Sequence, residues 1–137
     1  LYKAKISNQP TSKHINDGLK LSKAYITTAL KCVPPADKPL KNELDNCFNF
    51  FNKEIDNLKN LKAVIALGKI AFDACVYYYK SNYAFHEKIK FGHGKIFKVP
   101  DNVLLIGCYH PSPRNVNTGR INEKKMTNLF LKVLKLV

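Results

Sequence analysis

The chain has few acidic residues and no long apolar run. Its 137 residues hold ten Asp and Glu against 23 Lys and Arg, which leaves a formal net charge of +13. No apolar run approaches the roughly 18 residues that a membrane span needs, and the chain does not open on the apolar core of a secretory signal. These absences exclude a membrane-spanning protein. They also favour the cytoplasm, and the length of 137 residues predicts one domain over residues 1–137.

The scarcity of acidic residues leaves a positive field around the protein. Such a field attracts a polyanion, and nucleic acid is the usual partner. A lysine-rich coding bias would produce the same excess, and the basic residues are scattered along the chain instead of forming runs. Charge alone therefore favours a nucleic-acid partner without identifying one.

The chain has almost no methionine. Met126 is the only methionine and residue 1 is Leu, so we expect a segment upstream of Leu1.

The phosphate-binding loop pattern is absent from the chain. Gly68 and Lys69 follow an apolar run, but they are not part of a GxxxxGK[ST] pattern, which argues against nucleotide hydrolysis. A helix that starts at this point still presents unpaired N–H groups to an anion. We therefore expect Gly68 and Lys69 to contact a phosphate.

The four cysteines do not form a complete metal-ligand set. Cys75 and Cys108 lie in apolar, periodic segments, where a thiol behaves as a small core residue. Cys32 and Cys47 flank a proline-rich loop and would both be able to face a metal centre. Structural zinc and iron-sulfur sites ordinarily use four ligands, and a reducing cytoplasm disfavours a disulfide. The pair alone leaves the choice between a metal and packing open.

The spacing of apolar residues predicts strands that alternate with helices. The expected strands are Ala24–Leu30, Ala63–Leu67 and Val103–Cys108. Helices are expected from Lys41 to Leu58, after Gly68, and after the capping residue Asn122, the last with a buried stripe of Met126, Leu129, Phe130, Val133, Leu134 and Val137. Residues 83–99 fit an irregular hairpin or a loop excursion before the strand at Val103. This order is typical of an α/β fold with a parallel sheet covered on both faces.

The most informative stretch is HPSPRNVNTGR, from His110 to Arg120. His110 follows an apolar strand, and ligands of parallel α/β sheets bind at the carboxyl ends of strands. Pro111 and Pro113 are expected to keep both regular elements out of the loop that follows. The alternative is a surface turn with a hydrogen-bonded histidine. His86 and His93 are expected to be solvated loop residues.

Three stretches together resemble the uracil-DNA glycosylases, most closely the iron-sulfur family called type 5. They are AYITTALKCVPPADKPLKNELDNC, VIALGKIAFDA and YHPSPRNVNTGRI, with the FGHG turn at Phe91–Gly94 between the last two. The resemblance implies a three-layer αβα sandwich with a short, mainly parallel sheet. Its first strand, a glycine-rich active-site motif and a further Cys pair would all precede Leu1.

The resemblance implies excision of uracil or another deaminated base from DNA by hydrolysis of the N-glycosidic bond. The base must be flipped out of the duplex at a cost of a few kcal/mol. His110 would donate a hydrogen bond to the uracil O2, and such a donor to a developing oxyanion is worth about 3 kcal/mol. Thr28 matches a base-reading position that holds Asn in several relatives. One hydroxyl reads less than an amide, so we expect relaxed base discrimination.

The same resemblance assigns DNA contacts and a cofactor. The stretch from Ser112 to Asn115 would act as the wedge, with Arg114 and Arg120 as phosphate clamps. Cys32 and Cys47 match half of the four-cysteine set of a 4Fe-4S cluster, which the chain would complete only with help from a partner chain. Association of copies, or complementation by the missing segment, is also expected. The rival hypothesis is a catalytically inactive DNA-binding remnant of such an enzyme.

Overall fold

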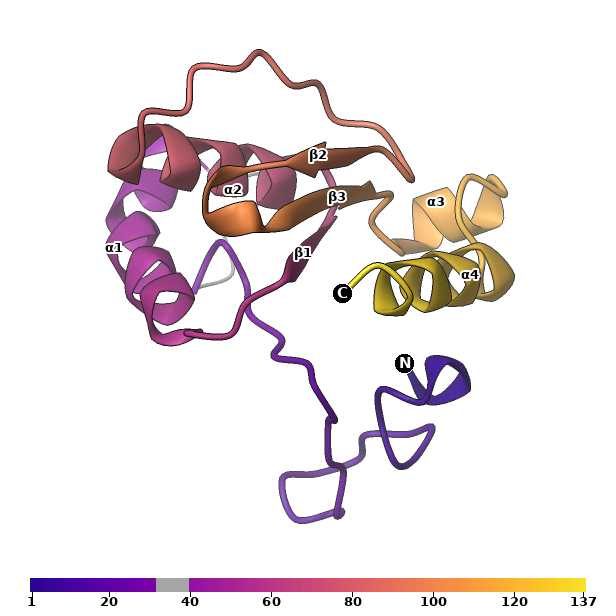
Figure 1. Ribbon diagram of the computed structural model, residues 1–137. Helices are drawn as coiled ribbons and strands as arrows, with labels where there is room; N and C mark the ends of the chain where they lie inside the picture. The colour runs from indigo at the N-terminus through magenta and orange to yellow at the C-terminus, as the bar shows by residue number, and fades with distance from the viewer. Residues whose placement is uncertain (32–39) are drawn as a thin grey trace. The chain divides into compact units, whose positions relative to one another are not determined.

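The computed structural model describes residues 1–31 and 40–137. The chain forms two compact units (Figure 1). One comprises residues 27–111 and contains the sheet, and the other comprises residues 1–26 and 112–137. The predicted single domain over residues 1–137 stays a prediction.

The sheet of the first unit has its most buried strand at the centre. Strand β1 (Ala63–Leu67) pairs in parallel with β3 (Leu104–Cys108), and β2 (Ile96–Lys98) pairs with the other edge of β3 in antiparallel orientation. All of β3 after Leu104 is buried. The predictions for β1 and β3 are confirmed. Of residues 83–99, only Ile96–Lys98 forms a strand, and it pairs with β3, so this segment is the loop excursion and not a hairpin of its own. Helices and a small mixed sheet confirm the α/β class.

Two helices of this unit form where the apolar spacing predicts them. Helix α1 (Lys41–Asn57) starts with a capping interaction, because the Glu43 carboxylate accepts the Leu40 N–H at 2.7 Å. Its stripe buries Cys47, Phe51 and Ile55. Helix α2 (Lys69–Asn82) follows β1 after the single residue Gly68 and buries Phe72, Cys75, Tyr78 and Tyr79.

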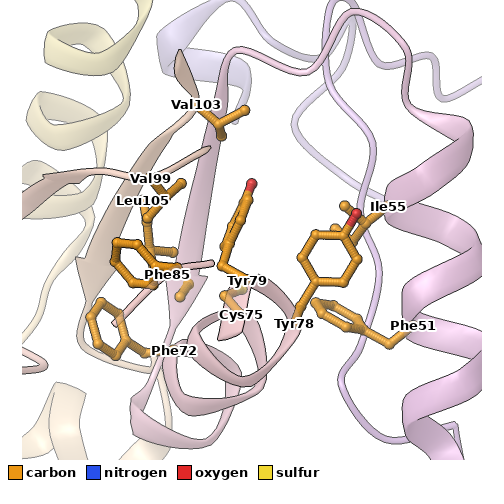
Figure 2. Packing of buried hydrophobic residues seen from close by; sticks show 11 residues of the cluster. Phe51, Ile55, Phe72, Cys75, Tyr78, Tyr79, Phe85, Val99, Val103 and Leu105 are labelled. Atoms are coloured by element: carbon orange, nitrogen blue, oxygen red, sulfur yellow. The ribbon is translucent and has the colours of Figure 1, made fainter. Parts of the chain in front are cut away.

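The core of this unit joins α1, α2 and the sheet through aromatic rings (Figure 2). The Phe51 and Tyr78 rings meet edge to face, with 6.5 Å between their centroids, and the Tyr78 hydroxyl donates to the Asp56 carboxylate at 2.6 Å. The Phe72 ring also meets the ring of Phe97 in β2, with 5.7 Å between their centroids. Side chains of α2 thus contact both α1 and the sheet. Tyr78 and Tyr79 are both buried in this core.

The two cysteines that the sequence assigns to the core are inert thiols. Cys75 and Cys108 are both buried. Burial raises the pKa of Cys75 to about 12 and that of Cys108 to about 11. Both thiols are therefore neutral near pH 7, and the packing role predicted for them is confirmed.

The second unit consists of a short 3-10 helix η1 (Tyr2–Ala4), helix α3 (Pro113–Asn117) and helix α4 (Glu123–Leu134). Asn122 caps α4 as predicted, since its side chain accepts the Lys125 N–H at 2.9 Å. Leu129, Phe130 and Val133 are buried, whereas Leu134 and Val137 at the end of the predicted stripe are exposed. In the part of the chain that the structure describes, no helix is both long and apolar enough to cross a membrane.

The prediction of a strand at Ala24–Leu30 is wrong. This segment has no regular structure, and Tyr25 and Ile26 are 57% and 61% exposed. Side chains attach this part of the chain to α1, because the Thr27 hydroxyl donates to Glu54 and the ammonium of Lys31, the next residue after the segment, lies 2.6 Å from the same carboxylate. A strand requires a neighbouring strand to pair its backbone N–H and C=O groups, and none of the described strands pairs with this segment.

The expectation that both prolines exclude regular structure after His110 is also wrong. Pro113 occupies the first position of α3, with Ser112 as the N-cap. Proline is well tolerated there, because its fixed φ suits a helix and its missing N–H would have no helical partner. The predicted loop is therefore a short helix followed by a turn.

Candidate active site

His110 lies two residues beyond the end of β3 and is exposed. The strand therefore carries it to the carboxyl end of the sheet, where the sequence placed it. Its side chain packs against the Gly68 backbone, since a Cβ added to Gly68 would lie 3.2 Å from the His110 Cβ. The Gly68 N–H also donates to the Cys108 carbonyl at 2.7 Å. The end of β3 is thus joined to the start of α2.

Gly68 allows this close approach because it has no Cβ and tolerates an unusual backbone conformation. Its φ of 101° and ψ of 167° fall in a region that is essentially restricted to glycine. Its carbonyl also accepts the Phe72 N–H at 3.1 Å, the first bond of α2. The unpaired N–H groups of the first turn give this end of the helix a partial positive charge.

Lys69 adds less charge to this place than the sequence suggests. Its ammonium is paired with the Asp73 carboxylate one turn further along α2, and both side chains are exposed. Such a pair is screened by water and contributes little to stability. A phosphate would have to compete with Asp73 for this lysine, so the predicted contact stays a prediction.

A second turn, Phe91–Gly94, is attached to the other side of β3. The Gly94 N–H donates to the Gly107 carbonyl at 2.8 Å, and the Gly107 N–H donates to the Lys95 carbonyl at 3.0 Å. A Cβ on Gly107 would lie only 2.4 Å from the Gly92 carbonyl oxygen. Glycine at position 107 is therefore required for this turn to lie against the strand.

The turn brings a second imidazole to the end of β3. The Tyr109 N–H donates to His93 Nδ1 at 3.3 Å, and the His93 and Tyr109 rings are stacked with centroids 5.2 Å apart and an interplanar angle of 13°. His93 is half-buried. The prediction of a solvated loop histidine is wrong for His93, whereas His86 is exposed as predicted. The glycines on both sides of His93 were the signal in the sequence that marked a tight, close-packed turn.

The predicted wedge lies in the second unit, at the start of α3. The Ser112 hydroxyl accepts the Asn115 N–H at 3.4 Å as a helix cap. Asn115 is half-buried, and its carbonyl accepts the Ile121 N–H at 3.2 Å. Arg114, between them, is exposed. Ser112 and Asn115 therefore stabilise the local backbone, and their contact with DNA stays a prediction.

The turn after α3 carries the second predicted phosphate clamp. Arg120 is exposed there. The Lys125 ammonium of α4 donates to the carbonyls of Gly119 at 2.8 Å and Arg120 at 3.3 Å. This lysine holds the backbone of the turn.

The remaining predicted residues lie near α1 or outside the described residues. Thr28 is exposed, and its hydroxyl donates to the Leu30 carbonyl. Cys47 is buried, and its Sγ accepts the Lys31 N–H at 3.4 Å, while Cys32 lies outside the described residues. Within residues 1–31 and 40–137, no group of three or more side chains could hold a metal ion. Of the predicted cluster ligands, Cys47 alone lies within the described residues, and the cluster stays a prediction.

The first unit thus brings together the start of α2, the end of β3 and the Phe91–Gly94 turn around His110 and Tyr109. This arrangement presents an exposed imidazole on a backbone that is fixed by hydrogen bonds on both sides. Such a group can donate to an oxyanion in a ligand, because the neutral ring keeps one N–H. The two arginines and the wedge residues belong to the second unit.

Comparison with known proteins identifies a family. The model of the family described as "Uracil DNA glycosylase superfamily" matches residues 1–135. A type-5 uracil-DNA glycosylase of Pyrobaculum aerophilum is 34% identical over 125 residues, which cover 91% of this chain and 52% of that protein.

Two further relatives show the same pattern. A type-5 uracil-DNA glycosylase of Thermus thermophilus is 33% identical over 134 residues, which cover 98% of this chain and 58% of the relative. One of Mycobacterium bovis is 31% identical over 137 residues, which cover 99% and 50%. The chain therefore spans about half the length of these relatives.

Proposed function

The chain belongs to the uracil DNA glycosylase superfamily, and we propose that it provides the His110-bearing part of an enzyme that removes uracil or another deaminated base from DNA. The observation that supports this most is the exposed imidazole of His110 at the carboxyl end of β3, packed against the glycine that starts α2. Relatives that carry the name type-5 uracil-DNA glycosylase support the same reaction class.

The proposed reaction is hydrolysis of the bond between the base and the C1′ of deoxyribose. As this bond breaks, its electron pair passes to the base, and the sugar becomes oxocarbenium-like. His110 donates a hydrogen bond to the O2 of the departing uracil, where negative charge develops. Water then adds its hydroxyl to C1′, and its proton neutralises the base anion. The products are the free base and an abasic site.

The grip on DNA is assigned to the exposed arginines. The target nucleotide has to leave the stack, which costs a few kcal/mol and requires contacts to the neighbouring phosphates. Arg114 and Arg120 are exposed and are suited to that role. The hydrogen bond between Ser112 and Asn115 stabilises the start of α3, the short helix that carries Arg114. Gly68 and Lys69 would contact a phosphate from the start of α2.

The reading of the base is assigned to Thr28. Its hydroxyl is exposed but already donates to the Leu30 carbonyl, so it keeps only its acceptor capacity for a ligand unless the backbone rearranges. A single hydroxyl discriminates less than an amide. We therefore expect other deaminated bases, such as hypoxanthine, to be accepted along with uracil.

No step of the proposed reaction passes through an iron-sulfur cluster. Of the predicted ligands, the structure describes Cys47 alone, and this thiol accepts a backbone N–H. A cluster completed by Cys32 and by residues of another segment stays a prediction, as does a cytoplasmic location.

Association of copies stays a prediction with one supporting observation. Among the strands that the structure describes, β1 pairs with β3 along one edge only. An unpaired strand edge favours pairing with another chain. Light scattering of the purified protein tests this, and a strictly monomeric profile would contradict it.

The proposed function is tested by incubating the protein with an oligonucleotide that contains uracil and then cleaving abasic sites with alkali. We expect strand breaks at the uracil. In His110→Ala the rate should fall by about 10²–10³-fold, the loss typical of a single oxyanion donor. His86→Ala removes another exposed histidine and serves as the matched control, with no change expected. If the wild type binds this DNA without producing breaks, the non-catalytic remnant is the correct alternative.

A further inference from the structure

We propose that His93 is a positioning residue for His110: it holds the Tyr109 peptide in place and thereby sets where the His110 imidazole stands. The inference rests on the proposed function and adds a residue to it. His93 belongs to the Phe91–Gly94 turn, which is distant in sequence from His110. It contacts Tyr109, the residue directly before His110.

The first step of the argument is the hydrogen bond to the backbone. Within β3, neighbouring strands fix the backbone as far as Cys108. Tyr109 lies beyond the last paired residue, and its N–H is instead donated to His93 Nδ1 at 3.3 Å. The His93 side chain thus holds the backbone one residue beyond the part of β3 that is paired with neighbouring strands. A ring that accepts at Nδ1 is neutral and carries its proton on Nε2.

The second step is the position of the Tyr109 side chain. Its ring is stacked on His93 and also meets Phe91 edge to face, with centroids 6.0 Å apart. The Phe91 ring in turn meets the ring of Phe72, a fully buried core residue, with 5.6 Å between their centroids. A continuous row of rings therefore connects the hydrophobic core to Tyr109. Both the backbone and the side chain of Tyr109 are held by the same turn.

The third step concerns the turn itself. The Gly94 N–H donates to the Gly107 carbonyl, and the Lys95 carbonyl accepts from the Gly107 N–H, so the turn is fixed to β3 directly after His93. Gly68 contacts His110 from the start of α2. With Tyr109 fixed on one side and Gly68 packed against the ring, the His110 imidazole is oriented before substrate arrives. Displacement of a catalytic group by about 1 Å can cost about 100-fold in rate.

Three substitutions of His93 separate positioning from a purely structural role. Asn in place of His93 keeps an acceptor near the position of Nδ1, Phe keeps the ring but no acceptor, and Ala keeps neither. We expect His93→Ala to lower the single-turnover rate of uracil release by about 10–100-fold, with DNA affinity within about twofold of the wild type. His93→Asn should recover most of the rate. His93→Phe should not, even where it restores thermal stability.

These results decide the proposal. Recovery by Asn and not by Phe supports positioning through the acceptor. If Asn and Phe behave alike, or if the loss of rate follows the loss of folded protein, His93 has a structural role only and the proposal is overturned. A loss that appears only in DNA affinity also overturns it. His86→Ala serves as the control for removal of a loop histidine.

A second measurement does not depend on activity. In ¹⁵N-resolved NMR spectra of the wild-type protein, we expect His93 to be the Nε2–H tautomer and the His110 ring signals to shift in His93→Ala but not in His86→Ala. A His93 with its proton on Nδ1, or an unchanged His110 ring, would overturn the proposal. If the wild type cleaves no DNA, the proposed function fails, and these spectra still show whether His93 positions His110.

Discussion

The stretches on the two sides of Pro111 are built in different ways. Before it, His110 stands on a backbone fixed by strand pairing, by Gly68 on one side and by the Phe91–Gly94 turn on the other. After it, Arg114 and Arg120 extend from a five-residue helix and a turn, with exposed side chains. Chemistry on a base requires fixed geometry, whereas attraction to phosphates tolerates movement because it acts over distance. Substitutions on the two sides should therefore fail in different ways.

The largest effect is expected for Gly107→Ala. The new Cβ would lie 2.4 Å from the Gly92 carbonyl oxygen, so backbone must move to admit it. We expect a loss of about 3 kcal/mol in the free energy of unfolding, measured by urea denaturation, with loss of base release.

Gly94→Ala is the matched control for that substitution. It lies in the same region and its Cβ would meet nothing within 4 Å, but its φ is +75°. It should cost only the strain of the left-handed conformation, about 1 kcal/mol. Equal losses for Gly94→Ala and Gly107→Ala would show that the close approach of the turn to β3 is unimportant.

The next effect is expected for Gly68→Ala, which tests the other side of His110. Its φ of 101° is unfavourable for alanine, at about 2 kcal/mol, and the new Cβ would press on the His110 Cβ at 3.2 Å. We expect the rate of base release to fall by more than the loss of folded protein explains, measured at a temperature where the variant remains folded. A rate that falls only in proportion to unfolding would contradict the role of this contact.

A smaller effect of another kind is expected for Arg114→Ala and Arg120→Ala. Each variant should weaken DNA binding about tenfold on all sequences and reduce the slope of log affinity against log salt by about one, because one phosphate contact is lost. Thermal stability should not change, since both side chains are exposed. Fluorescence anisotropy at several salt concentrations measures this. An unchanged slope would remove that arginine from the DNA contact.

The smallest effects are expected for the helix caps of the second unit. Asn122→Ala removes a cap at 2.9 Å and should lower the free energy of unfolding by about 1 kcal/mol. Ser112→Ala removes a longer one, at 3.4 Å, and should cost about 0.5 kcal/mol. Thermal denaturation measures both. A larger loss for Ser112 would mean that α3 is more important to this unit than its contacts indicate.

Two similar apolar segments show how far sequence patterns reach. Ala63–Leu67 and Ala24–Leu30 are both short and rich in β-branched or apolar residues, and both were predicted to be strands. Among the strands that the structure describes, one lies beside the first segment, since β1 pairs with β3, and none pairs with the second. In and directly after the other segment, Thr27 and Lys31 bind Glu54 of α1 through their side chains. A pattern within a segment carries no information about the presence of a partner.

The candidate site shows the same limit. The placement of His110 after a buried strand was predictable, because an apolar run followed by proline marks the end of a strand. The contact of His93 was not, because its partner is a backbone N–H 16 residues away, and every residue except proline has the same N–H. Only the pairing of Gly107 with the Phe91–Gly94 turn brings the two together.

Local patterns in the amino-acid sequence were sufficient to predict the α/β class, helices α1, α2 and α4, strands β1 and β3, the place of His110 and the resemblance to a family of glycosylases. These depend on local periodicity, caps and motifs, which operate within a few residues. The tertiary structure alone decided that Ala24–Leu30 is not a strand, that Pro113 starts a helix and that His93 holds Tyr109. Each of those depends on contacts or conformations set by the fold, where packing and hydrogen-bond partners come from distant parts of the chain.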